Sequence, residues 1–383
     1  MLPTLLMWPL ALWMVTRGRP PWGDEAHFLA TVRLFGNGLS LDLLRSYPEM
    51  SAPLTYLVYS LWGRLAGFDT AALRSLSPLI AWTTSAIWFF VLQRQCGLTR
   101  WTLVALAAIV FNPYFVGLSI FVFTDMLALL GLAIVTYGAS GNRPVLVAAG
   151  IAIATLSRQY LGFLVPAVIV SDFLVHVGRS DRPGSLTLAS LVGLMPLGML
   201  VMAWGWKLAP TSPLRDIYLS QGLHFDPHAL SLYLAVPGIY LLPLILVCGK
   251  GNDRQWVTAS VLATFVLLFA VQPSIAQTRE GTSSVGFVHQ ALASTLPPPL
   301  VNGAFWGLAT LWLKSLIDTL GVASRSWRTN GMTMTGVFPW IGCLMFLVVM
   351  PFSYMPWEKY ALPLFMLASL PLADQFSDVR TIG

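Results

Sequence analysis

Residues 186–206 read LTLASLVGLMPLGMLVMAWGW, a stretch without a charged side chain. Wound into an α-helix it would be roughly 30 Å long, which matches the hydrocarbon core of a lipid bilayer. Apolar stretches recur along the 383-residue chain, which is 56% hydrophobic and only 10% charged, with a mean hydropathy of +0.71. This composition excludes a soluble globular domain. We therefore expect an all-α, polytopic bundle of transmembrane helices.

The apolar stretches also set the expected number of spans, although several are short and interrupted by proline. We expect about 11 to 13 crossings in one transmembrane domain over residues 1–383. The polar interval 16–51 is the expected first extracytoplasmic loop, and 272–299 is an expected flexible loop. The candidate spans are residues 2–15, 52–65, 76–92, 103–118, 121–137, 145–156, 161–177, 186–206, 230–247, 257–271, 301–313, 337–350 and 360–372.

The charged residues indicate orientation and exclude some functions. The net charge is +6, and basic pairs in short connections are typical of cytoplasmic loops. Because the basic groups form no continuous stripe, we expect no nucleic-acid partner. The three cysteines are isolated, with neither metal-site spacing nor an even number for disulfides, which predicts packing roles. The basic pairs are Arg94/Arg100, Arg179/Arg182, Lys250/Arg254 and Arg325/Arg328, and the cysteines are Cys96, Cys248 and Cys343.

The first polar interval has the pattern of surface helices. Asp24 precedes Phe28, Val32 and Phe35 at helical spacing, and the run ends at the Gly-Asn-Gly of residues 36–38. This pattern predicts an amphipathic helix lying along the bilayer surface. A second short helix is expected over residues 41–45, before the span that begins after Pro53.

Asp24, Glu25 and His27 form a compact acidic and imidazole group just outside the first apolar stretch. Such a group can accept a proton or hold a cation bound to phosphate. The alternative roles are a plain N-cap for Asp24 and an interfacial aromatic residue for His27.

Asp125 is the only charged residue between Phe111 and Tyr137. A charge there is costly unless it faces a cavity or the membrane edge, which favours a role in a pocket. The alternative is helix capping at the bilayer surface, since Thr124 and Asp125 both suit an N-terminus.

Arg158 and Gln159 interrupt two apolar stretches, and Lys359 and Tyr360 open the last one. A guanidinium beside an amide suits a phosphate or a sugar hydroxyl, whereas a membrane-edge anchor explains Arg158 but not Gln159. Two i, i+4 pairs, Asp172/His176 and Lys314/Asp318, are assigned to structure. The histidine pair His224/His228, near Pro227, is expected to bind no metal because a third ligand is not evident.

In this order the motifs resemble the GT-C superfamily of membrane glycosyltransferases, which use polyprenyl-phosphate sugars as donors. The resemblance rests on WGDEAHF at residues 22–28, APLTY at 52–56, ALRSL at 72–76, FTD at 123–125 and KYALP at 359–363. Each motif has little specificity alone, and their order over most of the chain supplies it.

The pattern is nearest to the dolichyl-phosphate-glucose-dependent alpha-1,2-glucosyltransferases, which carry Asp-Glu-x-x-His, Tyr-Thr-Asp and Arg-Gln-Thr-Asn elements. The chain departs from that pattern because His27 comes one position early and Tyr160-Leu161 replaces Thr-Asn. The chain is also shorter than expected of that family. The identity of the sugar therefore stays open.

The resemblance implies catalytic roles for Asp24, Glu25 and Asp125, with Asp24 as the base in an inverting transfer. It implies substrate binding by a second set of residues, with the guanidinium of Arg158 on the donor phosphate. This set is His27, Arg74, Arg158, Gln159, Lys359 and Tyr360.

The expected partners are a polyprenyl-phosphate sugar donor, a glycan or glycolipid acceptor, and membrane lipids. The metal site is unknown, and a divalent cation, Mg²⁺ or Mn²⁺, is the one cofactor considered. The expected location is a bacterial inner membrane with the site facing the periplasm, the alternative being the endoplasmic reticulum membrane.

Two other classes of function stay open. A transporter or flippase of an amphipathic substrate would also carry membrane charges, but near the midplane at broken helices, and no internal repeat is evident. A non-catalytic scaffold would depend on no single acid. The topology poses a separate question: Asp24 and Asp125 share a face only if an even number of spans separates them, whereas three candidate spans lie between them.

Overall fold

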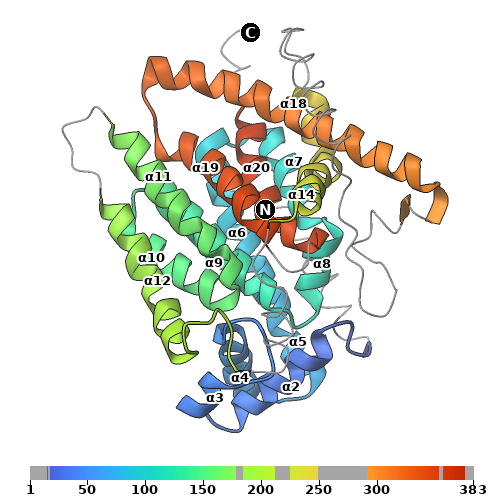
Figure 1. The fold of residues 1–383 in the computed structure, drawn as a ribbon, viewed down its shortest axis with the longest axis vertical. Coiled ribbons are helices and arrows are strands. Elements are labelled where there is room, and N and C mark those ends of the chain that lie inside the picture. Colours follow the sequence, from blue (N-terminus) through green and yellow to red (C-terminus); the bar gives the residue numbers. More distant parts are fainter. Residues whose placement is uncertain are drawn as a thin grey trace. The chain divides into compact units, whose positions relative to one another are not determined.

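The computed structural model describes residues 15, 18–177, 184–211, 225–248, 291–292, 294–352 and 357–375. In these ranges every regular element is a helix (Figure 1), which confirms the all-α prediction. The chain divides into two compact units: unit 1 comprises Met1–Val91 and Val110–Gly222, and unit 2 comprises Leu92–Ile109 and Leu223–Gly383. The expectation of one transmembrane domain stays a prediction.

The helices of the N-terminal part are short in the first loop and longer beyond it. They are α2 (Glu25–Gly36), α3 (Leu41–Arg45), α4 (Leu54–Ala66), α5 (Thr70–Arg74), α6 (Leu76–Cys96), α7 (Arg100–Val110), α8 (Pro113–Ile120), α9 (Thr124–Ser140), α10 (Pro144–Ser157), the 3₁₀ turn η1 (Gln159–Phe163), α11 (Leu164–His176) and α12 (Ser185–Ala203). The C-terminal part contains α14 (Pro227–Tyr240), α15 (Leu242–Cys248), α18 (Pro298–Asn330), α19 (Met334–Val349), η2 (Met350–Phe352), η3 (Glu358–Ala361) and α20 (Leu362–Asp374).

Five described helical segments are long and apolar enough to cross a membrane, or six if α7 and α8 form one bent span. Three shorter apolar helices accompany them. The chain is therefore polytopic, as predicted. The expected spans 2–15 and 257–271, and most of the expected flexible loop 272–299, lie outside the described residues. The five segments are Thr70–Cys96, Gln159–His176, Ser185–Ala203, Pro299–Thr329 and Met334–Phe352.

The expected spans at residues 52–65 and 360–372 are neither among these segments nor among the shorter apolar helices. Helix α4, in the first of them, has only 13 residues, about 20 Å of rise, and packs against α2. Helix α20, in the second, also has 13 residues and is buried within unit 2. Between Asp24 and Asp125 there remain Thr70–Cys96 and the bent pair of α7 and α8. If the bent pair counts as one span, two candidate crossings separate the two acids, an even number that is compatible with a shared face.

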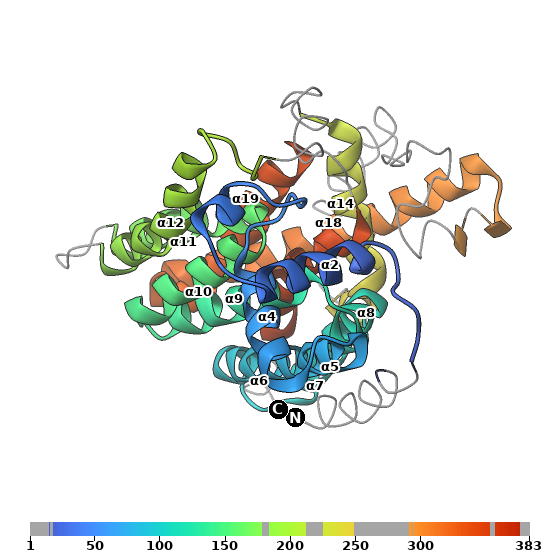
Figure 2. The same ribbon diagram turned by 90° about the horizontal axis from the view of Figure 1, so that it is seen from below.

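The first loop of unit 1 is built from helices whose apolar sides meet. Helix α2 starts after Asp24 and ends at Gly36, and α3 spans Leu41–Arg45, both as predicted. Helix α2 lies against α4 (Figure 2). Phe28 and Phe35 of α2 pack against Tyr56 of α4, with ring centroids 6.0 and 6.1 Å apart. The first loop is therefore an ordered platform rather than a coil.

Beyond the loop, α9, α10, α11 and α12 form the helical body of unit 1, with α10 packed against both α9 and α12. These helices approach closely because small residues line their contacts. A Cβ atom at Gly131 would lie 2.5 Å from the backbone nitrogen of Ala154, and one at Gly193 would overlap the carbonyl oxygen of Ala148.

In unit 2, α20 is buried along almost its whole length, and α19 packs against it. Helix α18 is much longer than the predicted span at residues 301–313 and packs against α14. Gly331, with φ of 79°, ends α18 in a conformation that favours glycine, and α19 begins at Met334. The ends of α18 and α19 are therefore held together by a tight turn.

Candidate functional site

Glu25 and Arg74 form a buried ion pair between α2 and the end of α5. Arg74 donates from Nε to Glu25 Oε1 at 2.8 Å and from Nη2 to Oε2 at 2.6 Å. The two side chains are 0% and 2% exposed. A paired, doubly hydrogen-bonded arrangement is what allows two charges to be buried at all.

Both members of this pair also bind backbone groups. The Glu25 carboxylate accepts the N–H groups of Trp22 and Val122, at 3.2 and 3.0 Å. Arg74 donates to the carbonyl oxygens of Arg19 and Pro20, at 2.6 and 3.1 Å. The pair thus ties the start of the first loop to the segment that precedes α9. This geometry favours positioning over direct chemistry, and the roles predicted for Glu25 in catalysis and Arg74 in binding stay predictions.

Asp24 occupies the N-cap position of α2, but its side chain makes no capping hydrogen bond. The residue is exposed, as is His27 one turn further along. Asp24 acts electrostatically on a buried carboxylate that the sequence analysis did not single out, Glu49. The capping explanation for Asp24 therefore does not account for its side chain.

Glu49 lies in the connection between α3 and α4, and it is 6% exposed. Burial raises its pKa to about 7, Thr31 lowers the pKa through a 3.2 Å hydrogen bond, Asp24 raises it and Arg158 lowers it. A carboxyl group with such a pKa exchanges its proton near neutral pH, as acid–base catalysts do. The sequence signal for Glu49 was weak: an acid in a polar loop, shortly before Pro53.

Asp125 and Arg158 form the second ion pair of unit 1. Arg158 Nη2 donates to Asp125 Oδ2 at 2.8 Å, with side-chain exposures of 13% and 3%. Asp125 lies in the first turn of α9, whose N-cap is Phe123, and Arg158 is the residue at which α10 ends. Neither Thr124 nor Asp125 is the cap that the alternative interpretation requires.

Gln159 directly follows Arg158, and its side-chain amide hydrogen-bonds to two loop segments, one before α4 and one after α12. Its Nε2 donates to the carbonyl oxygens of Met50 and Leu208, both at 2.8 Å. Met50 is the neighbour of Glu49 in the chain, so Gln159 fixes the segment that carries the buried acid. Its predicted contact with substrate stays a prediction.

The structure therefore gathers Asp24, Glu49, Arg158 and Asp125 in unit 1, which we call the acid cluster. Glu49 responds to both Asp24 and Arg158, and Arg158 binds Asp125. Asp24, Arg158 and Asp125 lie at helix ends, and Glu49 lies in a loop. The sequence analysis named three of the four.

Lys359 and Tyr360 belong to unit 2 and lie in η3, as expected for the start of the last helix. The Lys359 ammonium lies over the rings of Trp357 and Tyr360, 5.0 and 5.3 Å from their centroids. Their predicted role in substrate binding stays a prediction.

The two i, i+4 pairs assigned to structure both form, and their structural role stays a prediction. His176 Nδ1 lies 3.2 Å from Asp172 Oδ1, and Lys314 Nζ lies 2.9 Å from Asp318 Oδ2. Among the described residues, no three His, Cys, Asp or Glu side chains gather closely enough to hold a metal ion. The divalent cation considered from sequence stays a prediction.

No protein-family model matches the sequence, and no curated protein matches it. A search of solved structures found a likeness to ArnT from Cupriavidus metallidurans bound to undecaprenyl phosphate. The two chains are 14% identical, with a TM-score of 0.42, and the match covers 98% of this chain and 76% of the ArnT chain.

Proposed function

We propose that this protein is a membrane glycosyltransferase that moves a hexose from a polyprenyl-phosphate donor to an extracytoplasmic glycan or glycolipid acceptor, with inversion. The observation that carries the proposal is the acid cluster. Acids for proton transfer and a guanidinium for phosphate converge from four separate segments of an apolar helical chain.

Asp24 is the proposed base, because it is exposed and acts electrostatically on Glu49 within the cluster. As the acceptor oxygen forms its bond to the anomeric carbon, the bond from that carbon to the phosphate oxygen breaks and its electron pair leaves with the polyprenyl phosphate. The acceptor proton passes to the Asp24 carboxylate. Glu49, with its pKa raised to about 7, is suited to take up that proton from Asp24 at neutral pH.

Arg158 is the proposed ligand of the donor phosphate. Asp125 fixes its orientation through the 2.8 Å bond from Nη2, and the Arg158 side chain as a whole is 13% exposed. A guanidinium with a fixed orientation stabilises the charge that develops on the leaving phosphate. In this scheme Asp125 acts on the donor through Arg158, and the Glu25–Arg74 pair holds the backbone around them.

Transfer and transport differ in the depth at which the charges lie. A transporter is expected to place its charged residues near the membrane midplane, at unwound helices. In unit 1, Asp24, Asp125 and Arg158 lie at or next to helix ends. We propose that these helix ends lie at a membrane surface, the periplasmic face of a bacterial inner membrane, and not at the midplane.

The test compares Asp24→Asn with wild type by mass spectrometry of lipids and glycans from cells that express each protein. The amide keeps the shape of the side chain but cannot accept the proton, so the glycosylated product should disappear while protein abundance is unchanged. Asp42→Asn is the matched control, because Asp42 is an exposed acid of the same loop, 96% exposed and outside the cluster. Product at the wild-type level in Asp24→Asn would remove Asp24 as the base.

A further inference from the structure

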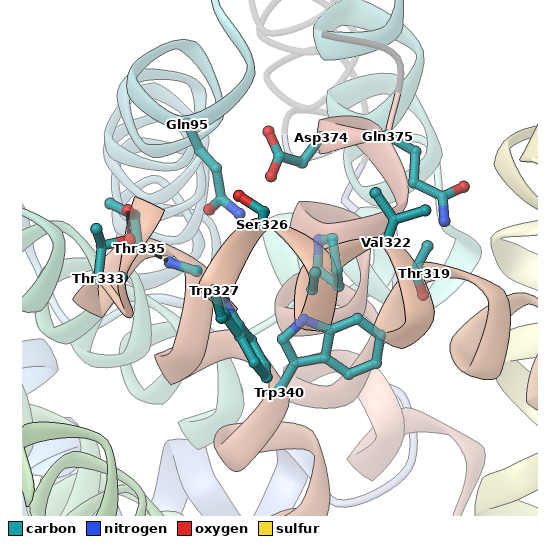
Figure 3. Close-up of a pocket in the computed structure, with 14 residues that line it drawn as sticks. Gln95, Thr319, Val322, Ser326, Trp327, Thr333, Thr335, Trp340, Asp374 and Gln375 are labelled. Atoms are coloured by element: carbon teal, nitrogen blue, oxygen red, sulfur yellow. Dashed lines mark hydrogen bonds between the residues drawn. The ribbon is translucent and has the colours of Figure 1, made fainter. Parts of the chain in front are cut away.

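Unit 2 contains a pocket of about 330 Å³ whose lining residues all lie outside the acid cluster. Gln95 contributes from the last turn of α6, Trp327 from the C-terminal part of α18, Trp340 from α19, and Asp374 and Gln375 from the end of α20 (Figure 3). This volume is at the lower end of the range of small-molecule sites, roughly 300 to 1,000 Å³.

The turn between α18 and α19 shapes one wall of the pocket. Gly331 ends α18 with a positive φ, and the Thr333 hydroxyl caps α19 by accepting the N–H of Gly336 at 3.2 Å. A Cβ atom at position 336 would lie 3.1 Å from Nε1 of Trp327. The absence of a side chain at Gly336 therefore makes room for the Trp327 indole against the start of α19.

The lining has two kinds of surface. In Figure 3 the indoles of Trp327 and Trp340 lie toward one side of the pocket, and the Gln95 amide and the Asp374 carboxylate lie toward the other. None of the 14 lining residues is a lysine or an arginine. A phosphate would therefore find no ammonium or guanidinium group among the lining residues, and an acyl chain would leave the amides and hydroxyls without partners.

We infer that this pocket binds a neutral polyhydroxylated ligand, either a soluble sugar or the sugar headgroup of a glycolipid. The flat apolar face of a pyranose ring packs on indoles, while its hydroxyl groups both donate and accept hydrogen bonds. An ammonium group would use the indoles and Asp374 alone, because it has no acceptor for the amide N–H groups of Gln95 and Gln375. A sugar can hydrogen-bond to the amides, the carboxylate and the hydroxyl groups of the lining, because its own hydroxyls both donate and accept.

The test uses the full-length protein in phosphatidylcholine nanodiscs and saturation-transfer NMR with the methyl glycosides of glucose, galactose and mannose as probes. At least one glycoside should receive saturation on its ring protons. Trp340→Ala and Asp374→Ala should each weaken that binding about tenfold, the scale of losing one stacking or charged contact. A sugar site elsewhere in the protein would keep its saturation-transfer signal in Trp340→Ala. The difference in signal between wild type and this variant therefore reports binding in the pocket alone, and it does not depend on the proposed function.

Trp340→Phe, which keeps an aromatic ring, should retain most of the signal and guards against a folding defect. Trp82→Phe is the matched control, because Trp82 is exposed on α6 outside the pocket, and its signal should equal that of wild type. Nanodiscs that contain a glucosyl-diacylglycerol separate the two sources: a suppressed glycoside signal assigns the pocket to a lipid headgroup, and an unchanged signal assigns it to a soluble sugar. Equal saturation-transfer signals in wild type and Trp340→Ala for all three glycosides would overturn the inference. So would binding of choline, but of none of the glycosides, at a site that depends on Trp340.

Discussion

The buried pair of Glu25 and Arg74 allows a sharp test of whether these residues are structural. The perturbation is a double-mutant cycle with Glu25→Ala, Arg74→Ala and the double substitution. Either single substitution leaves one charge buried with backbone hydrogen bonds but without its counter-charge, because both side chains are almost fully enclosed.

The size of the effect follows from the contacts. Two charge-assisted hydrogen bonds, of 2.8 and 2.6 Å, join the side chains, and the carboxylate also holds the N–H groups of Trp22 and Val122. Breaking a buried pair by removing one partner costs about 3 to 5 kcal/mol. The double substitution removes both charges, so it should cost less than the sum of the singles, with a coupling energy on the order of 3 kcal/mol.

The assay is reversible unfolding in mixed detergent micelles, followed by circular dichroism. The control is the same cycle on Asp42 and Arg45, whose side chains are 96% and 52% exposed and 3.8 Å apart, and which should show almost no coupling. Additive single substitutions at Glu25 and Arg74, each costing less than about 1 kcal/mol, would refute the argument. That result would restore Glu25 as a candidate for direct catalysis.

Three further outcomes are expected. Because the folded protein raises the pKa of Glu49 from 4.5 to about 7, wild type should lose stability on the order of 3 kcal/mol as pH rises through that window, while Glu49→Gln should show no such loss in unfolding titrations. Arg158→Lys should lower kcat/KM for the donor roughly ten- to hundredfold in a polyprenyl-phosphate release assay, and full activity would make Arg158 a membrane anchor. Gly193→Ala should cost about 1 to 3 kcal/mol because its Cβ meets the Ala148 carbonyl, whereas Gly198→Ala on the same helix meets nothing and should be neutral or stabilising by chemical unfolding.

Local patterns in the sequence predicted the features that depend on neighbouring residues. The ends of α2 were predicted from Asp24 and from the Gly-Asn-Gly of residues 36–38, although the Asp24 side chain makes no capping hydrogen bond, and the break between α10 and η1 falls at Arg158 and Gln159 as predicted. The all-α, membrane-spanning class follows from apolar length alone, since only helices satisfy the backbone inside a bilayer when no closed barrel is formed.

Pairings between distant residues came only from the tertiary structure. Glu25 meets Arg74 across 49 positions, and Asp125 meets Arg158 across 33. No sequence periodicity links such distant positions. The sequence therefore identified all four residues as charged residues of interest, but it did not show that Glu25 pairs with Arg74 or that Arg158, the partner of Asp125, acts on Glu49. The raised pKa of Glu49 has the same origin, because it depends on burial and on charges brought in by other segments.

The tertiary structure also decided which apolar stretches can cross the membrane. Composition made residues 52–65 a span, but α4 is too short and buries its aromatic side against α2. Apolar character alone reports that a surface is removed from water, whether by lipid or by protein. Sequence therefore determined the all-α, membrane-spanning class of this protein and named three of the four residues of the acid cluster, whereas the partners of those residues required the packed chain.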